Sequence, residues 1–255
     1  MSILRKLFNR YYFLSVLVLI MLSGQATICR GQQLPDNIPD TALAWINQIR
    51  NAEGLKALTM DPRLNKVAET HSKEMVRYKM LTDSNPDLGT PFDRMKSAKL
   101  TDTNNLAAVA EAKTWNLLQE QLESPENLSR ILSPEMTHAG IGLEKDSTGN
   151  IWLTIHMTER AITFTQFILV QSNTTPAEHS ITIKGNTPHK KIRVILVPAG
   201  DTNPDLEDDY NIAPDSGGNF EALLTFGSAT GSFDFEFYVQ EDGTYKLKNF
   251  FNMNL

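Results

Sequence analysis

The stretch Asp61-Pro62-Arg63-Leu64-Asn65-Lys66-Val67-Ala68-Glu69-Thr70-His71-Ser72-Lys73-Glu74-Met75 decides how the first half of this chain folds. Asp61 suits the N-cap of a helix, and Pro62 suits the first helical position because its missing N–H would be unpaired there anyway. Apolar residues then recur at helical spacing and share one buried face with His71. The residues on that face are Leu64, Val67, Ala68, His71, Met75 and Tyr78. The sequence predicts an amphipathic helix whose histidine is either a core residue with one hydrogen-bond partner or the floor of a pocket.

Further helices and then strands surround this helix. Two prolines keep residues 33–40 out of regular structure and predict a linker there. Helices are expected over residues 42–51, 91–95, 111–123 and 125–132. Beyond Pro134 the period falls to two residues, which predicts strands over 139–144 and 151–157 joined by a turn at 146–150. This order favours an α/β layer in which helices cover a small antiparallel sheet.

A different pattern begins near residue 161. Short strands separated by Gly-, Asn- and Asp-rich turns predict a small β-sandwich. Its strands are expected at 162–170, 180–184, 191–197, 220–226, 232–239 and 244–251. The acidic segment between Asp201 and Asp215 is either a calcium loop or a solvated loop. We predict a solvated loop because Leu206 and Ile212 stand where an EF-hand needs Gly and Glu.

The charge of the chain argues against nucleic acid as a partner. The 255 residues carry a net charge of −6, with 41% hydrophobic and 21% charged residues. Residues 1–32 contain four basic and no acidic side chains, so the remainder holds 20 basic and 30 acidic side chains, a net charge of −10. A surface of this sign repels phosphate backbones.

Residues 1–32 have the layout of a secretory signal peptide. Basic residues at 5, 6 and 10 precede an apolar run over residues 11–22, and small residues follow at Gly24 and Ala26. Cleavage after Ala26 or after Gly31 would both fit. An uncleaved anchor is the competing interpretation, but a run of twelve residues is short for a span of ~20. We therefore expect export, with no stable membrane span after cleavage.

Cys29 is the only cysteine of the chain, so a disulfide within one chain is excluded. Lipid modification of Cys29 is the alternative. Ile28 precedes it where a lipoprotein signal has a small residue, and lipidation is therefore not favoured.

An ordered series of short motifs resembles a known family. The motifs are Asn47-Gln48-Ile49-Arg50, Gly54-Leu55, Asp61-Pro62, the run from Ala68 to Met75, Thr90-Pro91-Phe92-Asp93-Arg94-Met95, Asn105-Leu106-Ala107, Ser124-Pro125 and Gly140-Ile141-Gly142. In this order and spacing, residues 40–160 resemble bacterial members of the CAP superfamily, which includes cysteine-rich secretory proteins, venom antigens and plant pathogenesis-related proteins. The resemblance implies an α-β-α sandwich with a cleft of histidines and acidic groups, where some members bind a divalent metal.

The positions of that cleft have changed in this chain. By the resemblance, His71 matches the first histidine, the family glutamate falls on Asn104, the second histidine falls on Asn127, and an acidic position falls near Ser124. A loop histidine of bacterial members falls on Asp83. One histidine with amides and a hydroxyl is a poor zinc site. We therefore predict a degenerate cleft at His71, Asn104, Ser124 and Asn127, with no metal and no cofactor, and a neutral His71 whose pKa is lowered by burial.

Two functions remain open from the sequence. The first is an exported, non-catalytic CAP-domain protein that binds an unknown extracellular ligand or protein. The rival is a secreted hydrolase of peptides or cell-wall material, with a rearranged and metal-dependent site built from His71, His138 and His156. The sequence contains no Gly-x-Ser-x-Gly elbow and no cysteine suited to catalysis, so we expect no enzyme.

The predicted fold class is α+β. The expected organisation is a leader over residues 1–32, a linker over 33–40, a CAP-like domain over 41–160 and an all-β sandwich over 161–255. The protein is expected to be secreted, periplasmic or at the cell surface.

Overall fold

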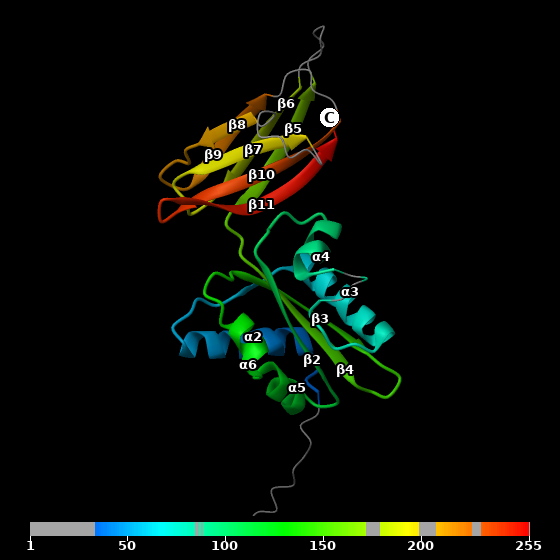
Figure 1. The fold of residues 1–255 in the computed structure, drawn as a ribbon. Helices are drawn as coiled ribbons and strands as arrows, with labels where there is room; N and C mark the ends of the chain where they lie inside the picture. The colour runs from blue at the N-terminus through cyan, green and yellow to red at the C-terminus, as the bar shows by residue number, and fades with distance from the viewer. Residues whose placement is uncertain are drawn as a thin grey trace, which may run out of the picture. The chain divides into compact units, whose positions relative to one another are not determined.

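The structure is a computed structural model that describes residues 34–84, 87, 89–171, 179–198, 208–225 and 231–254 (Figure 1). The predicted signal peptide and its cleavage sites lie outside these residues. Leu34 apart, the described residues belong to one unit, Pro35–Leu255. In this part of the chain, no helix has both the length and the apolar character that a membrane span requires.

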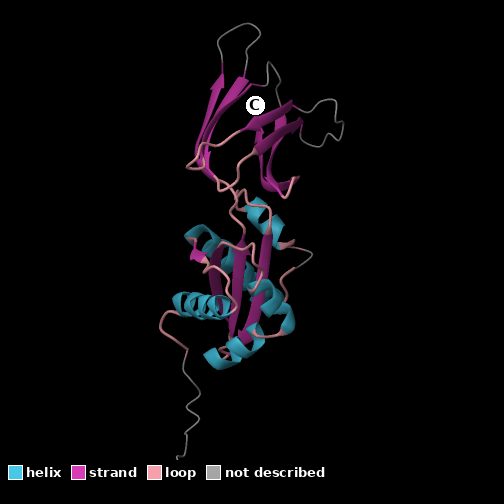
Figure 2. Ribbon diagram, turned by 90° about the vertical axis from the view of Figure 1, so that its left-hand side faces the viewer, coloured by secondary structure: helices cyan, strands magenta, loops and turns pink. Residues whose placement is uncertain are grey.

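The first half is built around a four-stranded sheet. Its strand order is β1-β3-β4-β2, with β1 (Thr59–Met60) parallel to β3 and the other pairs antiparallel. The larger strands are β2 (Asn105–Ala112), β3 (His138–Lys145) and β4 (Ile151–Thr158). The helices are α2 (Ile38–Ala52), α3 (Pro62–Tyr78), α4 (Pro91–Ser97), α5 (Trp115–Leu122) and α6 (Pro125–Ile131). They lie on both faces of the sheet, which confirms the α-β-α sandwich (Figures 1 and 2).

Helix α3 is pressed directly onto β3 because two glycines leave room for its backbone. A Cβ at Gly140 would lie 2.1 Å from the carbonyl carbon of Leu64, and one at Gly142 would lie 2.0 Å from the nitrogen of Glu69. Real side chains do not tolerate such distances, so the Gly-Ile-Gly motif fixes how closely the helix approaches the sheet. This contact carries His71 down to the sheet surface.

Two helix boundaries differ from the sequence prediction. Helix α2 begins at Ile38, inside the expected linker, because Asn37 caps it and Pro39 occupies a first-turn position where its missing N–H costs nothing. The helix expected over 111–123 begins only at Trp115. Residues 105–112 instead form strand β2, in which the backbone pairs with β4 along its full length.

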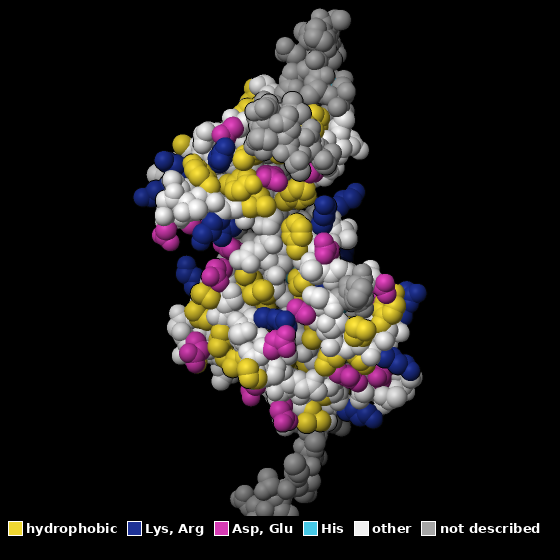
Figure 3. All heavy atoms as spheres, in the orientation of Figure 1, with side chains coloured by type: hydrophobic (Ala, Val, Ile, Leu, Met, Phe, Trp, Pro, Cys, Tyr) yellow, Lys and Arg dark blue, Asp and Glu magenta, His cyan; other side chains and the backbone are white. Residues whose placement is uncertain are grey.

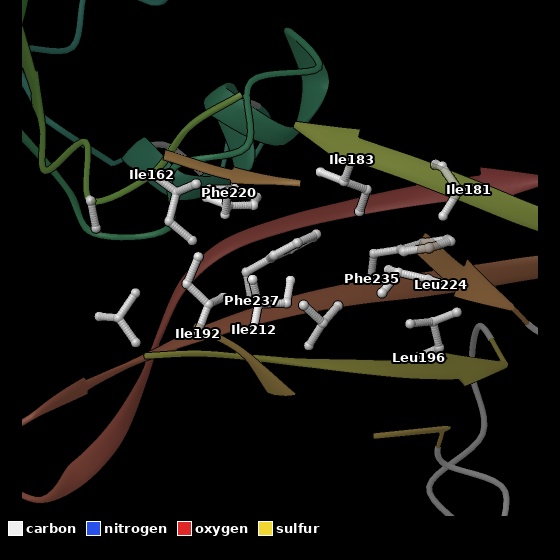
Figure 4. Close-up of a cluster of buried hydrophobic side chains, with 13 residues drawn as sticks. Ile162, Ile181, Ile183, Ile192, Leu196, Ile212, Phe220, Leu224, Phe235 and Phe237 are labelled. Carbon is white, nitrogen blue, oxygen red and sulfur yellow. The ribbon is translucent and has the colours of Figure 1, made fainter. Parts of the chain in front are cut away.

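The second half is the expected sandwich of two sheets. One sheet has the order β5-β6-β9 and the other β11-β10-β7-β8. The strands are β5 (Thr163–Gln171), β6 (His179–Asn186), β7 (Ile192–Pro198), β8 (Asp208–Ile212), β9 (Asn219–Thr225), β10 (Ser232–Glu241) and β11 (Thr244–Asn254). Phe235 and Phe237 on one sheet face Ile181 and Ile183 on the other, all of them fully buried (Figure 4).

Strand β8 was not predicted. Its residues fall in the segment that the sequence assigned to a solvated acidic loop, yet they pair with β7 from Leu196 opposite Asp208 to Ile192 opposite Ile212. Arg193 binds the carboxylate of Asp209 at 2.9 Å, which explains how an acidic residue is accommodated in the strand. Residues 201–207 of the acidic segment lie outside the described residues, and Asp215 at its end accepts from the N–H groups of Gly217 and Asn219.

Polar contacts join β11 to the end of β4. The ammonium of Lys248 lies 2.8 Å from both carboxylate oxygens of Glu159 and 3.0 Å from Glu241. Asn249 donates to Asp102 at 3.1 Å. The apolar clusters of the sandwich contain no residue before Ala161, but the exact domain boundaries stay a prediction.

Acidic and basic side chains are interspersed on the face drawn in Figure 3. This face shows no continuous basic patch of the kind that binds phosphate groups.

Candidate functional site

His71 lies on α3 with none of its surface exposed. Its Nε2 is 2.8 Å from the carbonyl oxygen of Thr82. A carbonyl only accepts, so Nε2 carries the proton. Burial, and then the charge of Arg94, lower the pKa of His71 to about 4 against the weaker opposing effects of Thr82 and Asp83. The ring is therefore neutral at pH 7, as predicted, and its Nδ1 keeps a lone pair that has no partner among the described residues.

His156 lies close to His71, in the middle of β4. It is opposite Ala107 of β2 and Gly140 of β3, and it is fully buried. Neither ring nitrogen has a hydrogen-bond partner among the described residues. Burial, then the charges of Arg94 and His71, lower the pKa of His156 to about 3. The predicted alternation of β4 is correct, because Thr154 of the same face bonds to Ser72 of α3.

Arg94 of α4 holds the described backbone that follows Thr82, the hydrogen-bond partner of His71. Its two terminal nitrogens donate to the carbonyl oxygens of Asp83 at 2.8 Å and of Gly89 at 3.3 Å. The carboxylate of Asp83, which stands at the family's loop-histidine position, binds Arg130 at 2.9 Å. Side chains of α3, α4 and α6 thus hold this loop in place, and we call His71, His156 and their cover, Thr82 and Asp83, the sealed region.

A divalent cation does not fit the sealed region. Its two imidazoles are the available nitrogen donors, and the guanidinium of Arg94 lies near enough to depress the pKa of both. A second cation would be repelled, and zinc sites use three or four ligands. Within the described part of the chain, no three His, Cys, Asp or Glu side chains are grouped to hold a metal.

Asn127 does not bond to His71. Its side-chain oxygen accepts from the N–H of Val109 at 3.2 Å and its nitrogen donates to the carbonyl of Val109 at 2.9 Å. Gln121 makes the same pair of bonds to Glu111, at 2.8 and 2.6 Å. These amides take the place of a neighbouring strand along the open edge of β2, where unpaired backbone groups would otherwise be left.

The other predicted residues also lie apart from His71. Asn104 precedes β2 and donates to Glu159 at 2.9 Å, beside Lys248. Ser124 caps α6 through a 3.4 Å bond from Asn127 N. His138 lies at the far end of β3, bonded to Thr137, and burial and Arg160 lower its pKa. Of the expected cleft set, the hydrogen bonds bring only Ser124 and Asn127 together.

An open pocket lies beside His71 along α3, between α3 and α4. Its volume is about 520 Å³, within the usual range for small-molecule sites. Helix α3 contributes Lys66, Val67, Thr70 and Glu74, the loop contributes Asp87 and Gly89, and α4 contributes Asp93, Arg94, Ser97 and Ala98. We call this set of residues the α3–α4 pocket.

Arg94 and Glu74 of the α3–α4 pocket form no ion pair with one another or with other described residues. Arg94 is 6% exposed, its Nε has no partner and no carboxylate of the described residues forms an ion pair with it. Burial lowers the pKa of Arg94 to about 10, opposed by Asp83, Glu74 and Asp93. Burial raises the pKa of Glu74 despite Arg94 and Arg77 nearby. The carboxylate of Asp93 is already used to cap α4 through Thr90.

Sequence reasoning missed the α3–α4 pocket. Lys66, Thr70 and Glu74 recur every four residues along α3, which places them on one stripe beside the buried face. That spacing was available in the sequence. The position of Arg94 opposite them was not, because it depends on the path of the loop before α4.

The first half of the chain matches a known protein family. Residues 43–157 match the family described as "CAP: Cysteine-rich secretory protein family". This match agrees with the resemblance of residues 40–160 to the CAP superfamily. The chain is also similar to a curated relative and to solved structures.

One such relative is the uncharacterized protein YkwD of Bacillus subtilis, 31% identical over 109 residues, which cover 42% of this chain and 41% of YkwD. The chain thus spans less than half the length of this relative. An extracellular SCP-domain protein of Bacillus anthracis is similar over 48% of this chain and 41% of its own, with 23% identity and a TM-score of 0.41. An outer surface protein of Borrelia burgdorferi is similar over 47% of this chain and 90% of its own, with 16% identity and a TM-score of 0.43.

Proposed function

We propose that this chain is an exported, non-catalytic binding protein that holds a small polar ligand in the α3–α4 pocket. The observation that carries the proposal is the contrast across α3. Toward the sheet both histidines are fully buried and neutral, whereas the adjacent stripe of α3 lines an open pocket with polar and charged side chains. The leader pattern of residues 1–32 supports export.

The sealed region is poorly suited to acid–base catalysis. A general base has to reach the proton that it removes, directly or through one water. The Nε2 proton of His71 is held by Thr82, and neither histidine has exposed surface. Their lowered pKa values leave both rings uncharged at pH 7, so neither can donate a proton as an imidazolium.

One observation favours the hydrolase as the second candidate. His71 Nδ1 and both nitrogens of His156 are buried without partners, and unpaired buried polar atoms are often found at functional sites. This hypothesis requires Thr82 and Asp83 to move away and expose the rings. His138, its third histidine, is bonded to Thr137 instead.

Two measurements on the purified protein distinguish these functions. The first is hydrolysis of peptides and cell-wall fragments, with and without zinc, by wild type and by the His71→Gln variant. We expect no turnover from either protein. Turnover by wild type that disappears in His71→Gln would establish the hydrolase.

The second measurement is an NMR screen of small polar compounds on the ¹⁵N-labelled protein. We expect amide shifts at Thr70, Glu74, Ser97 and Ala98. Shifts at Thr82 and His156 without shifts at Glu74, Ser97 and Ala98 would contradict binding in the α3–α4 pocket.

A further inference from the structure

The two walls of the α3–α4 pocket carry opposite charges that do not neutralise each other. Glu74 of α3 and Arg94 of α4 both line it. No ion pair or hydrogen bond joins the Glu74 carboxylate to another described residue, although the charge of Arg94 acts on its pKa. Both groups are thus close to the same space but too far apart to bond directly.

Arg94 keeps hydrogen-bonding capacity for a ligand. A guanidinium has five N–H donors, and two of those of Arg94 are used by the carbonyls of Asp83 and Gly89. These carbonyls are dipoles and supply no negative charge. A cation that is 6% exposed without an anionic partner is costly, and a bound carboxylate would remove that cost.

We propose that the α3–α4 pocket binds a zwitterion of amino-acid or short-peptide type, with its carboxylate on Arg94 and its ammonium on Glu74. This inference rests on the proposed function and specifies its ligand. A simple anion would meet the carboxylates of Glu74, Asp87 and Asp93, and a simple cation would meet Lys66 and Arg94. A neutral ligand would leave Glu74 and Arg94 unpaired. A molecule with both charges satisfies both walls.

The remaining lining fits such a molecule. Ser97 offers a hydroxyl that can donate and accept, whereas the Thr70 hydroxyl donates to the carbonyl of Lys66 and can only accept from a ligand. Val67 and Ala98 offer small apolar surfaces for a methyl side chain. A volume of about 520 Å³ leaves room for more than a single small amino acid, so free amino acids and short peptides have to be separated by experiment.

The test is calorimetry of the full chain with L-alanyl-L-alanine and three derivatives: N-acetylated, C-amidated, and blocked at both ends. L-alanine is the further probe that distinguishes a free amino acid from a peptide. We expect the unblocked dipeptide to bind at least about tenfold more tightly than each blocked form, since a charge-assisted bond is worth about 1.4 kcal/mol or more.

Variants of two glutamates on α3 identify the binding surface. Glu74→Gln should abolish the advantage of the free ammonium, so that the dipeptide and its N-acetyl form bind equally. Glu69→Gln is the matched control, because Glu69 lies on the same helix, is exposed and does not line the pocket. It should retain wild-type binding. Arg94 is left intact, since its loss would also release the loop.

The outcomes separate this inference from the proposed function. Equal binding of the free and doubly blocked dipeptides, with amide shifts at Thr70 and Ser97, would overturn the zwitterion but leave pocket binding in place. Absence of binding by any of the five probes would likewise overturn the zwitterion, while the NMR screen decides the proposed function. The preference for the free ammonium could also be lost in Glu69→Gln to the same extent as in Glu74→Gln. That result would show that the preference does not arise in this pocket.

Discussion

Two adjacent faces of helix α3 differ in whether their polar side chains are buried or line an open pocket. Toward the sheet, His71 and His156 are sealed beneath a loop held by Arg94 and Arg130. Toward α4, Glu74 and Arg94 line an open pocket. His71, which matches a family cleft histidine by resemblance, is thus buried by the chain itself, while the adjacent face of the same helix lines an open pocket.

Gly142→Ala should displace α3 from β3 and so disturb both the sealed region and the α3–α4 pocket. Its Cβ would lie 2.0 Å from a backbone nitrogen of the helix, so we expect a loss of about 3 kcal/mol in the free energy of unfolding. Urea denaturation followed by circular dichroism measures this loss. Gly217→Ala is the control, because its Cβ meets side-chain atoms at 3.2 and 3.3 Å. Equal losses in both variants would refute the close seating of α3.

His71→Leu should lower the free energy of unfolding, whereas His156→Leu should leave it unchanged or raise it. Leucine at 71 leaves the carbonyl of Thr82 without its donor, which should cost about 1–3 kcal/mol of stability. Leucine at 156 removes two nitrogens that have no partners, so the variant should be as stable as wild type or more stable. Equilibrium unfolding of both variants at pH 7 checks this. A destabilised His156→Leu protein would mean that the His156 ring has polar partners in solution.

Acidification should destabilise the protein through the sealed region. The folded-state pKa values of His71 and His156 are about 4 and about 3, below the ordinary 6.5. Between those limits the unfolded chain binds protons that the folded chain does not, so stability falls as pH falls from about 6.5 to about 4. Each histidine contributes at most about 1.4 kcal/mol per pH unit.

The His156→Leu variant provides the control for this pH dependence. It removes one of the two depressed groups, so its unfolding free energy should fall less steeply over the same range. Identical slopes for wild type and variant would mean that His156 titrates normally and is not sealed.

Glu74→Gln should barely change stability. The carboxylate is partly buried but makes no bond to another described residue, so we expect a change within about 0.5 kcal/mol. Thermal unfolding of the ligand-free protein measures it. A loss above about 1 kcal/mol would reveal a structural bond to Glu74 and weaken its assignment to ligand binding.

Much of the fold was predictable because local patterns and tertiary packing agree. The alternating Phe233, Phe235 and Phe237 place β10 in the sandwich, and Asp61 and Pro62 start α3 at the observed residue. Strand β2 was missed because its residues 107, 108 and 110 are alanines, which have weak strand preference, and only pairing with β4 makes them a strand.

The candidate site was less predictable than the fold. Burial and neutrality of His71 follow from its place on the apolar face of α3. Its partner, a backbone carbonyl at Thr82, has no side-chain signature in the sequence. Asn127 matches a cleft position by resemblance, but its bonds to Val109 depend on β2 being an edge strand. Long-range contacts of this kind are set by chain path and not by residue type.

Modification of native protein by diethyl pyrocarbonate at pH 7, followed by peptide mass spectrometry, tests the sealed region most directly. All five histidines of the chain are read in one sample, and His189, whose side chain is 19% exposed, serves as the internal reference. We predict that His71 and His156 react at least about tenfold more slowly than His189, because both have no exposed surface. Modification of His71 at the rate of His189 would contradict the account, since it would show that the family cleft is open in solution.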